Sequence, residues 1–155
     1  MASKRDQIKL SDQEVGDFLT AERVITVATL GSDGWPHLTA LWFVMRDREP
    51  WIYTYGKSQK VKNLERDPRA TLLAERGDEY QELRGVMLKT SAEIRRQPDE
   101  VSGLAEQIFV KYQGNAQIDD TASKALRAQA AKRVAIRFVV EQTISWDHAK
   151  LGGSY

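Results

Sequence analysis

The sequence contains no cysteine, which excludes a disulfide framework, a zinc–thiolate centre and a cysteine nucleophile. It also contains no apolar run near the roughly 18 residues that a transmembrane helix needs. Residues 1–14 lack the apolar centre of a signal peptide. We therefore expect a cytoplasmic protein that has no membrane partner.

An excess of charge of either sign is missing too, because 23 Lys and Arg residues face 22 Asp and Glu residues. This balance argues against a nucleic-acid partner and leaves room only for a local basic patch. The 155 residues show no repeat and no Gly/Ser linker, and 41% of them are hydrophobic. These values predict one globular domain that spans residues 1–155.

Chemical motifs are equally scarce. The chain has no Gly-x-Ser-x-Gly element and no evident pair of nucleophile and base. Its two histidines, His37 and His148, are far apart in the sequence and have no adjacent series of carboxylates, so we expect no metal site. No residue is identified as catalytic.

Hydrophobic periodicity predicts a mostly β chain with several helices. The first helix, 12–21, is well marked, because Ser11 and Glu14 have the spacing of a capping box. Further helices are expected at 58–67, 98–113 and 121–132, with a loop at 114–120. Strands are expected at 23–30, 36–45, 51–55, 70–75, 83–96 and 133–148.

The early strands are joined by short turns, and Asp33-Gly34 is a strong hairpin signal. Three consecutive strands joined in this way predict an antiparallel meander rather than parallel βαβ units. The expected architecture is a small antiparallel barrel with peripheral helices.

A cluster of lysines follows the third predicted strand, in the segment YTYGKSQKVKNL at 53–64. Gly56-Lys57-Ser58 resembles the end of a phosphate loop, but Trp51 stands where the full motif requires glycine. A glycine turn into a helix still presents free N–H groups and a positive dipole end to an anion. Two interpretations stay open: a phosphate site, or a helix with solvated lysines on its outer face.

Other polar and aromatic residues also leave two interpretations open. His37 is either a proton donor or cofactor contact, or a surface histidine beside a turn. The tryptophans lie in or beside predicted strands, where such residues either fill a core or interface or face a planar ring. They are Trp35, Trp42, Trp51 and Trp146.

Several segments taken together resemble a known family. These are PHLTALWF at 36–43, IYTYGKSQK at 52–60, Asn63-Leu64, Asp67-Pro68-Arg69, ATLLAE at 70–75 and SWDHAKLGG at 145–153. They are similar to the pyridoxamine-phosphate-oxidase-like split-barrel superfamily. The resemblance is strongest to its actinobacterial flavin/deazaflavin oxidoreductases, which use coenzyme F420.

This resemblance implies a six-stranded antiparallel split β-barrel, the FMN-binding split barrel, with peripheral helices. It also implies a homodimer with cofactor sites at the subunit interface. The implied cofactor-binding residues are Pro36, Thr39, Ala40, Leu41, Trp42, Tyr53, Thr54, Lys57, Ser58, Lys60, Trp146 and Lys150.

The resemblance also assigns roles to these residues. Ser58 and Lys60 would hold phosphate with help from Lys57, and residues 39–43 would offer backbone groups to the cofactor ring. Trp146 and Lys150 would close the site from the partner subunit.

Two departures from the family decide between cofactors. Classical FMN-binding oxidases carry arginine where this chain has Thr39, and arginine or lysine where it has Gln59. The remaining cations, Lys57, Lys62 and Arg66, suit the phosphodiester and oligoglutamate tail of F420 better than one compact phosphate.

We therefore expect an F420-dependent oxidoreductase. It would transfer hydride from reduced F420 to a planar conjugated substrate such as a quinone, a biliverdin-like tetrapyrrole or another electrophile. An FMN-binding oxidoreductase of the same fold and a non-catalytic F420- or tetrapyrrole-binding protein are the alternatives.

Overall fold

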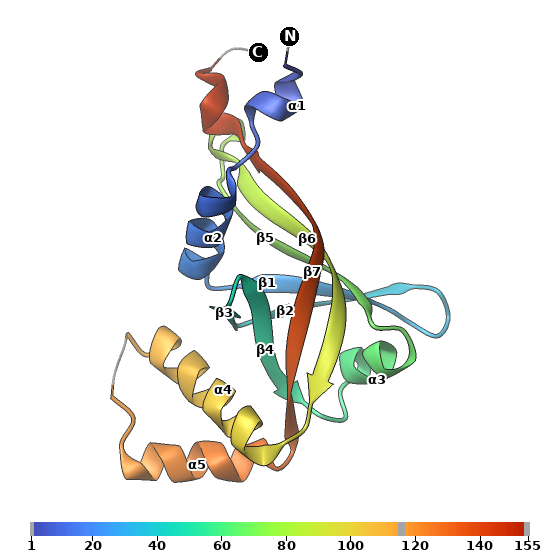
Figure 1. The fold of residues 1–155 in the computed structure, drawn as a ribbon, viewed down its shortest axis with the longest axis vertical. Coiled ribbons are helices and arrows are strands. Elements are labelled where there is room, and N and C mark those ends of the chain that lie inside the picture. Colours follow the sequence, from blue (N-terminus) through green and yellow to red (C-terminus); the bar gives the residue numbers. More distant parts are fainter. Residues whose placement is uncertain (1, 115–116, 154–155) are drawn as a thin grey trace.

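The computed structural model describes residues 2–114 and 117–153 and contains a curled sheet of seven strands (Figure 1). All strand pairs are antiparallel, and the order across the sheet is β2-β1-β5-β6-β7-β4-β3. The expected fold class, mainly β with peripheral helices, is confirmed, with seven strands instead of six. The strands are β1 Ile25–Leu30, β2 Pro36–Leu41, β3 Phe43–Arg46, β4 Glu49–Tyr55, β5 Arg69–Arg76, β6 Arg84–Arg95 and β7 Arg133–Asp147.

The extra strand arises at Trp42, where the prediction of one strand over 36–45 is wrong. The segment breaks there, so that β2 pairs with β1 while β3 pairs with β4 at the opposite edge of the sheet. The expected three-stranded meander therefore does not form. The indole of Trp42 instead stacks on the ring of Tyr112, with ring centroids 4.3 Å apart. One short segment thus supplies both edges of the sheet and curls it into a half-barrel.

The helices lie around this sheet (Figure 1). Helix α2, Asp12–Ala21, has the predicted bounds, and its capping box is present: Ser11 Oγ accepts from Glu14 N–H at 3.2 Å, and the Glu14 carboxylate accepts from Ser11 N–H at 2.6 Å. The short α1 was not expected from the sequence. The other helices are α1 Lys4–Gln7, α3 Gln59–Arg66, α4 Pro98–Tyr112 and α5 Asp120–Ala130, with single 3₁₀ turns at Tyr80–Glu82 and His148–Leu151.

The prediction of a loop over 114–120 is tested only in part. Residues 115 and 116 lie outside the described residues, and Asp120 already belongs to α5. None of the helices that the structure describes is long and apolar enough to cross a membrane.

Two hydrophobic clusters form on opposite faces of the sheet, because successive side chains of a strand point to opposite sides. Ile52 of β4 enters the main core inside the curled sheet with Phe18 and Phe138. Its neighbour Trp51 points the other way and packs beneath α4, where Leu104 is fully buried. Helix α4 therefore adds a second layer outside the half-barrel.

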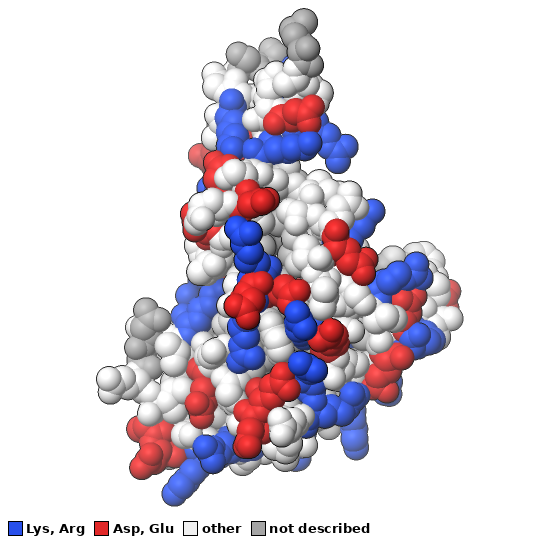
Figure 2. Space-filling model, viewed as in Figure 1, with Lys and Arg blue, Asp and Glu red and all other residues white. Residues whose placement is uncertain are grey.

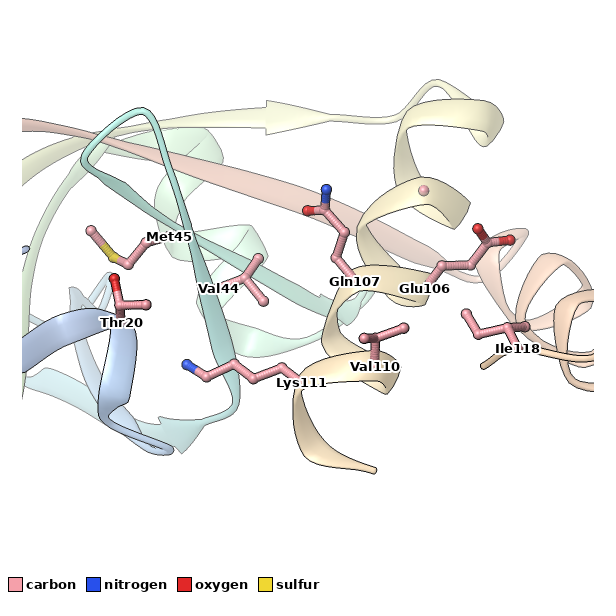
Figure 3. A pocket seen from close by; sticks show the side chains of 9 residues that line it. Thr20, Val44, Met45, Glu106, Gln107, Val110, Lys111 and Ile118 are labelled. Atoms are coloured by element: carbon pink, nitrogen blue, oxygen red, sulfur yellow. The ribbon is translucent and has the colours of Figure 1, made fainter. Parts of the chain in front are cut away.

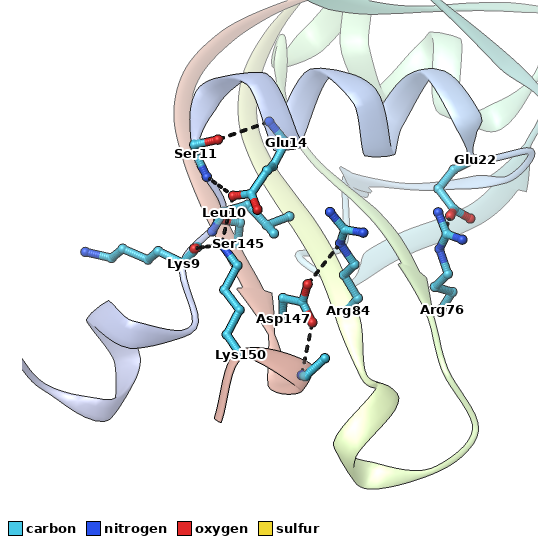
Figure 4. A network of polar contacts seen from close by, with 11 residues as sticks. Lys9, Leu10, Ser11, Glu14, Glu22, Arg76, Arg84, Ser145, Asp147 and Lys150 are labelled. Carbon is cyan, nitrogen blue, oxygen red and sulfur yellow. Dashed lines mark hydrogen bonds and ion pairs between the residues drawn. The ribbon is translucent and has the colours of Figure 1, made fainter. Parts of the chain in front are cut away.

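A polar network joins the two ends of the chain (Figure 4). The Lys150 ammonium donates to the Lys9 carbonyl and to the Glu14 carboxylate, both at 2.8 Å, and thereby lowers the pKa of Glu14 to about 2. Leu10 N–H donates to Ser145 Oγ at 3.0 Å. The segment before α2 is thus fastened to the end of β7.

Gly85 provides a test of this end of the sheet. Gly85 lies opposite Trp146, and a Cβ at position 85 would come within 2.3 Å of the indole Cζ2. The half-buried indole would have to move to admit the methyl group, so Gly85→Ala should lower the free energy of unfolding by about 1–3 kcal/mol in urea denaturation.

The matched control is Gly16→Ala in α2, where an added Cβ meets nothing within 4 Å and should not destabilise. Adding Trp146→Leu to Gly85→Ala should recover part of the loss. Equal stability of the two alanine variants would contradict this packing.

Candidate functional site

The lysine-rich segment forms a tight corner between β4 and α3. Gly56 N–H donates to the carbonyl of Lys132 at 2.9 Å, which ties the corner to the residue before β7. Ser58 N–H donates to the carbonyl of Tyr55 at 3.1 Å and closes the turn. Ser58 then takes the N-cap position of α3, so the corner presents the free N–H groups of a helix start.

A buried cation lies beside a buried hydroxyl at this corner. Lys60 is only 6% exposed, and its ammonium donates to Thr54 Oγ1 at 3.1 Å. Burial lowers the pKa of Lys60, and no described carboxylate forms an ion pair with it. Ser58 Oγ is buried without any hydrogen-bond partner and does not cap the helix. The corner therefore holds positive charge and a free hydroxyl that an anionic ligand would satisfy.

Residues outside the predicted cofactor-binding set hold α3 in place, among them Arg66, which the sequence had assigned to the cofactor tail. Asn63 is fully buried; its amide donates to Thr29 Oγ1 at 3.0 Å and accepts from the Gln59 amide at 2.8 Å. The Arg66 guanidinium donates to the carbonyl of Leu30. The sequence feature that could have identified Asn63 is an asparagine on the buried side of a short amphipathic helix. These bonds fix the corner against β1.

A cavity of about 300 Å³ lies next to this corner. The hairpin between β1 and β2 contributes Trp35, Pro36 and His37 to its walls, and α3 contributes Gln59 and Asn63. The structure therefore places Pro36 and His37, from segment 36–43, against α3, which begins in segment 52–60.

Not all expected residues face this corner. Thr54 and Lys60 meet there and Ser58 lies at the N-cap of α3, whereas Tyr53 points to the α4 side of the sheet with the Arg133 guanidinium 4.9 Å from its ring centroid. Burial raises the pKa of Tyr53. Lys57 is exposed.

The expected residues of β2, with the adjoining Trp42, also divide between two faces. Thr39 and Leu41 are half-buried, as is His37, whereas Pro36, Ala40 and Trp42 are exposed. Four buried side-chain polar atoms of the described residues lack a hydrogen-bond partner, and three belong to predicted site residues: Thr39 Oγ1, Tyr53 Oη and Ser58 Oγ. The fourth, Arg84 Nε, lies 3.5 Å from an Asp147 carboxylate oxygen.

Trp146 and Lys150 lie away from the corner within one chain. They belong to the end of β7 and the turn after it, which Figure 1 shows beside the chain termini, while α3 lies at the far end of the sheet. Lys150 is engaged with Lys9 and Glu14.

The surroundings of the site carry mixed charge. Figure 2 shows Lys and Arg interspersed with Asp and Glu over the face in view. In residues 2–114 and 117–153, no group of three His, Asp or Glu side chains is arranged to hold a metal ion. The distinctive electrostatic feature of the corner is therefore the buried ammonium of Lys60 rather than a broad basic surface.

Lys60 provides a stability test. Replacing a buried, unneutralised ammonium with a side chain of similar length and no charge removes a desolvation cost, so Lys60→Met should keep or raise the free energy of unfolding. Lys62→Met, two residues along and exposed, is the matched control and should change it by less than about 0.5 kcal/mol. A loss above about 1 kcal/mol in Lys60→Met would mean that the ammonium mainly stabilises the fold.

Comparison with solved structures places the fold in context. A conserved hypothetical protein of Mycobacterium tuberculosis, Rv2991, shares 40% identity with a TM-score of 0.90, covering 99% of this chain and 95% of that one. A structure named F420 reductase shares 20% identity with a TM-score of 0.64, covering 82% of this chain and 93% of that one.

An FAD-binding protein of Mesorhizobium loti also shares 20% identity, with a TM-score of 0.62, covering 88% of this chain and 93% of the other. At 20% identity these last two likenesses show the fold alone. A search of curated proteins found no match.

The family assignment comes from the sequence itself. Residues 11–147 match the family model described as pyridoxamine 5'-phosphate oxidase, which covers the chain from the cap of α2 to the end of β7. The half-barrel and the corner after β4 fall within this match. The chain belongs to the pyridoxamine 5'-phosphate oxidase family.

Proposed function

We propose that this protein binds coenzyme F420 and is an oxidoreductase that reduces a planar conjugated substrate. One observation carries the proposal: in the first turn of α3 the Lys60 ammonium is buried with no carboxylate partner among the described residues, and the hydroxyl of Ser58, the N-cap residue, is buried without a partner. A phosphate group would neutralise the ammonium, accept from the hydroxyl and meet the positive end of the helix dipole.

The distribution of the other cations favours F420 over FMN. Lys57 and Lys62 are exposed beside the buried Lys60, so positive charge continues outward from the corner. The Gln59 amide, at a position that is basic in classical FMN oxidases, is bonded to Asn63 and adds no charge. A cofactor with a phosphodiester and several carboxylates suits this arrangement better than one with a single compact phosphate.

Strand β2 supplies features that suit the cofactor ring. It is an edge strand, and its register with β1 leaves the backbone groups of Leu38 and Ala40 on the free edge. The Thr39 hydroxyl is buried and unpartnered. In the proposal, residues 39–42 orient the ring, Ser58 and Lys60 hold the phosphate, and Lys57 assists. Bound reduced F420 supplies a hydride, and the protein supplies orientation and exclusion of water.

A homodimer is part of the proposal. Large apolar side chains are exposed along β2 and beside it, with Trp35 75%, Leu38 60% and Trp42 52% exposed. Exposed apolar patches of this kind are typical of association surfaces. A second copy would cover this surface and could bring its own Trp146 and Lys150 to the corner. The proposed quinone, biliverdin-like tetrapyrrole or other electrophile would bind beside the ring.

Binding of FMN at the same corner is the second candidate. It is favoured by Ser58 and Lys60, whose hydroxyl and ammonium suit any phosphate group. With either cofactor we propose a cytoplasmic protein, and this part of the proposal rests on the sequence alone.

A direct titration tests the proposed cofactor. Purified protein should quench F420 fluorescence saturably and bind FMN at least about tenfold more weakly. The Lys57→Ala/Lys60→Ala variant should stay folded by circular dichroism and lose at least about tenfold in F420 affinity, because charge-assisted bonds to phosphate are removed. Lys124→Ala, an exposed lysine on α5, is the control. Unchanged affinity in the double variant would contradict the site, and preference for FMN would favour the second candidate.

The dimer has its own test. Leu38→Glu places a charge in the exposed apolar surface of β2, where it cannot disturb a buried core. Light scattering after size exclusion should show a dimer for the original chain and a shift towards monomer for the variant. A monomeric original chain would contradict the proposed dimer without affecting the corner.

A further inference from the structure

A second cavity, of about 690 Å³, lies between α2, β3, α4 and the segment before α5 (Figure 3). This volume is within the range of small-molecule sites, and the lining is largely apolar with a few polar groups, as such sites usually are. Val44, Val110 and Ile118 supply the apolar wall, and Thr20 and Gln107 supply polar groups. It is separate from the corner at α3.

Lys111 reaches into this cavity from α4 (Figure 3). Its ammonium donates to the main-chain carbonyls of Glu22 at 2.7 Å and of Phe43 at 3.0 Å. It also lies 4.3 Å from the centroid of the Phe43 ring. A lysine has three protons to donate, and among the described residues the third has no acceptor.

Within residues 2–114 and 117–153, no carboxylate forms an ion pair with Lys111. The side chain of Glu22, whose charge Lys111 senses, is paired with Arg76 at 2.7 Å. Arg23 adds positive charge from the other side, where its guanidinium lies 4.8 Å from the Tyr112 ring centroid. Burial, with Arg23 adding to it and Glu22 opposing it, lowers the pKa of Lys111 to about 8.

Two further charged side chains lie nearby. The Glu106 carboxylate also lines the cavity and accepts from Ser123 Oγ at 3.2 Å, which leaves its negative charge in place, but it lies on the side of Ile118, away from the Lys111 ammonium (Figure 3). Arg46 donates to the Gln107 side chain at 2.7 Å. An anion would therefore find an unneutralised ammonium at one end of the cavity.

The edge of β3 offers a further pair of polar groups. Residues 47–48 form the two-residue turn between β3 and β4, so Arg46 and Glu49 form the backbone hydrogen-bonded pair next to the turn. Hydrogen-bonded pairs alternate along antiparallel strands, so the backbone N–H and C=O of Met45 point away from β4. Phe43 points the same way, but its N–H is taken by the Tyr112 hydroxyl at 3.0 Å and its carbonyl by Lys111. A peptide strand cannot continue pairing past Phe43, so the free groups of Met45 suit a small ligand instead.

We propose that this cavity binds a small monocarboxylate with an apolar body. Its carboxylate accepts from the Lys111 ammonium, and its body lies against Val44, Val110 and Ile118. A negative charge on the ligand would complement the positive charges of Lys111 and Arg23. The site is additional to the proposed F420 site and does not depend on it.

Calorimetric titration of the protein tests the proposal with three probes: 1-naphthoate, 4-phenylbutyrate and octanoate. At least one should bind saturably at one site per chain, and its neutral amide should bind at least about tenfold more weakly. The absence of saturable binding by all three at millimolar concentration would overturn the proposal.

Two variants locate the binding. Gly103 lines the cavity, and an added Cβ there meets nothing within 4 Å, so Gly103→Leu should fold, fill the space and lower affinity at least about tenfold. Gly16→Ala is the matched control and should leave affinity unchanged. Lys111→Met should also weaken binding at least about tenfold, and Lys124→Met should not.

If Lys111→Met unfolds because two carbonyls lose their donor, Gly103→Leu still tests whether the ligand binds in this cavity. Full affinity in Gly103→Leu would overturn the assignment.

Proton uptake on binding is a further readout. Because a carboxylate favours the charged amine, binding at pH 8 should take up as much as about half a proton, and binding at pH 6 almost none. Equal proton exchange at both pH values would contradict a role for Lys111.

Discussion

The structure depends on one break in the chain, at Trp42. Residues on either side of it form the two edges of a single sheet, β2 and β3, so the sheet must curl to bring its edges within one residue of each other. The stacking of Trp42 on Tyr112 and the bond from Phe43 N–H to the Tyr112 hydroxyl hold the break. The end of β4 pairs with the start of β7, and the curl lets the corner that follows pack α3 against β1.

The corner shows a conflict between stability and binding. A lysine that is nearly fully buried with one hydroxyl as its partner loses hydration and gains little in return. The same is true of a buried serine hydroxyl that bonds to nothing. Such groups are understandable where a ligand completes their interactions, and the buried Thr39 hydroxyl adds a third instance. Lys111 of α4 repeats the pattern, because its ammonium donates to two main-chain carbonyls and lies over the Phe43 ring.

Local signals in the sequence were enough for much of the fold. Ser11 and Glu14 defined α2 to the residue, Asp33-Gly34 marked the first hairpin, and Pro98 began α4. The break at Trp42 was not visible, because 36–45 has strand-forming residues throughout and only the pairing with opposite edges interrupts it. That Tyr53 and Thr54 point to opposite faces of the sheet could have been expected, since neighbouring residues of a strand face opposite sides. The engagement of Lys150 with Glu14, and the role of Asn63, depend on contacts distant in sequence that no local pattern encodes.

The most direct test of the account is a crystal structure of the protein with F420 bound. We predict that the phosphodiester lies at the start of α3, accepting from Ser58 Oγ and from the Lys60 ammonium, with the ring along residues 39–42, at the end of β2 and the break after it. A complex in which the phosphate binds elsewhere, while Ser58 Oγ and Lys60 keep only their present contacts, would contradict it.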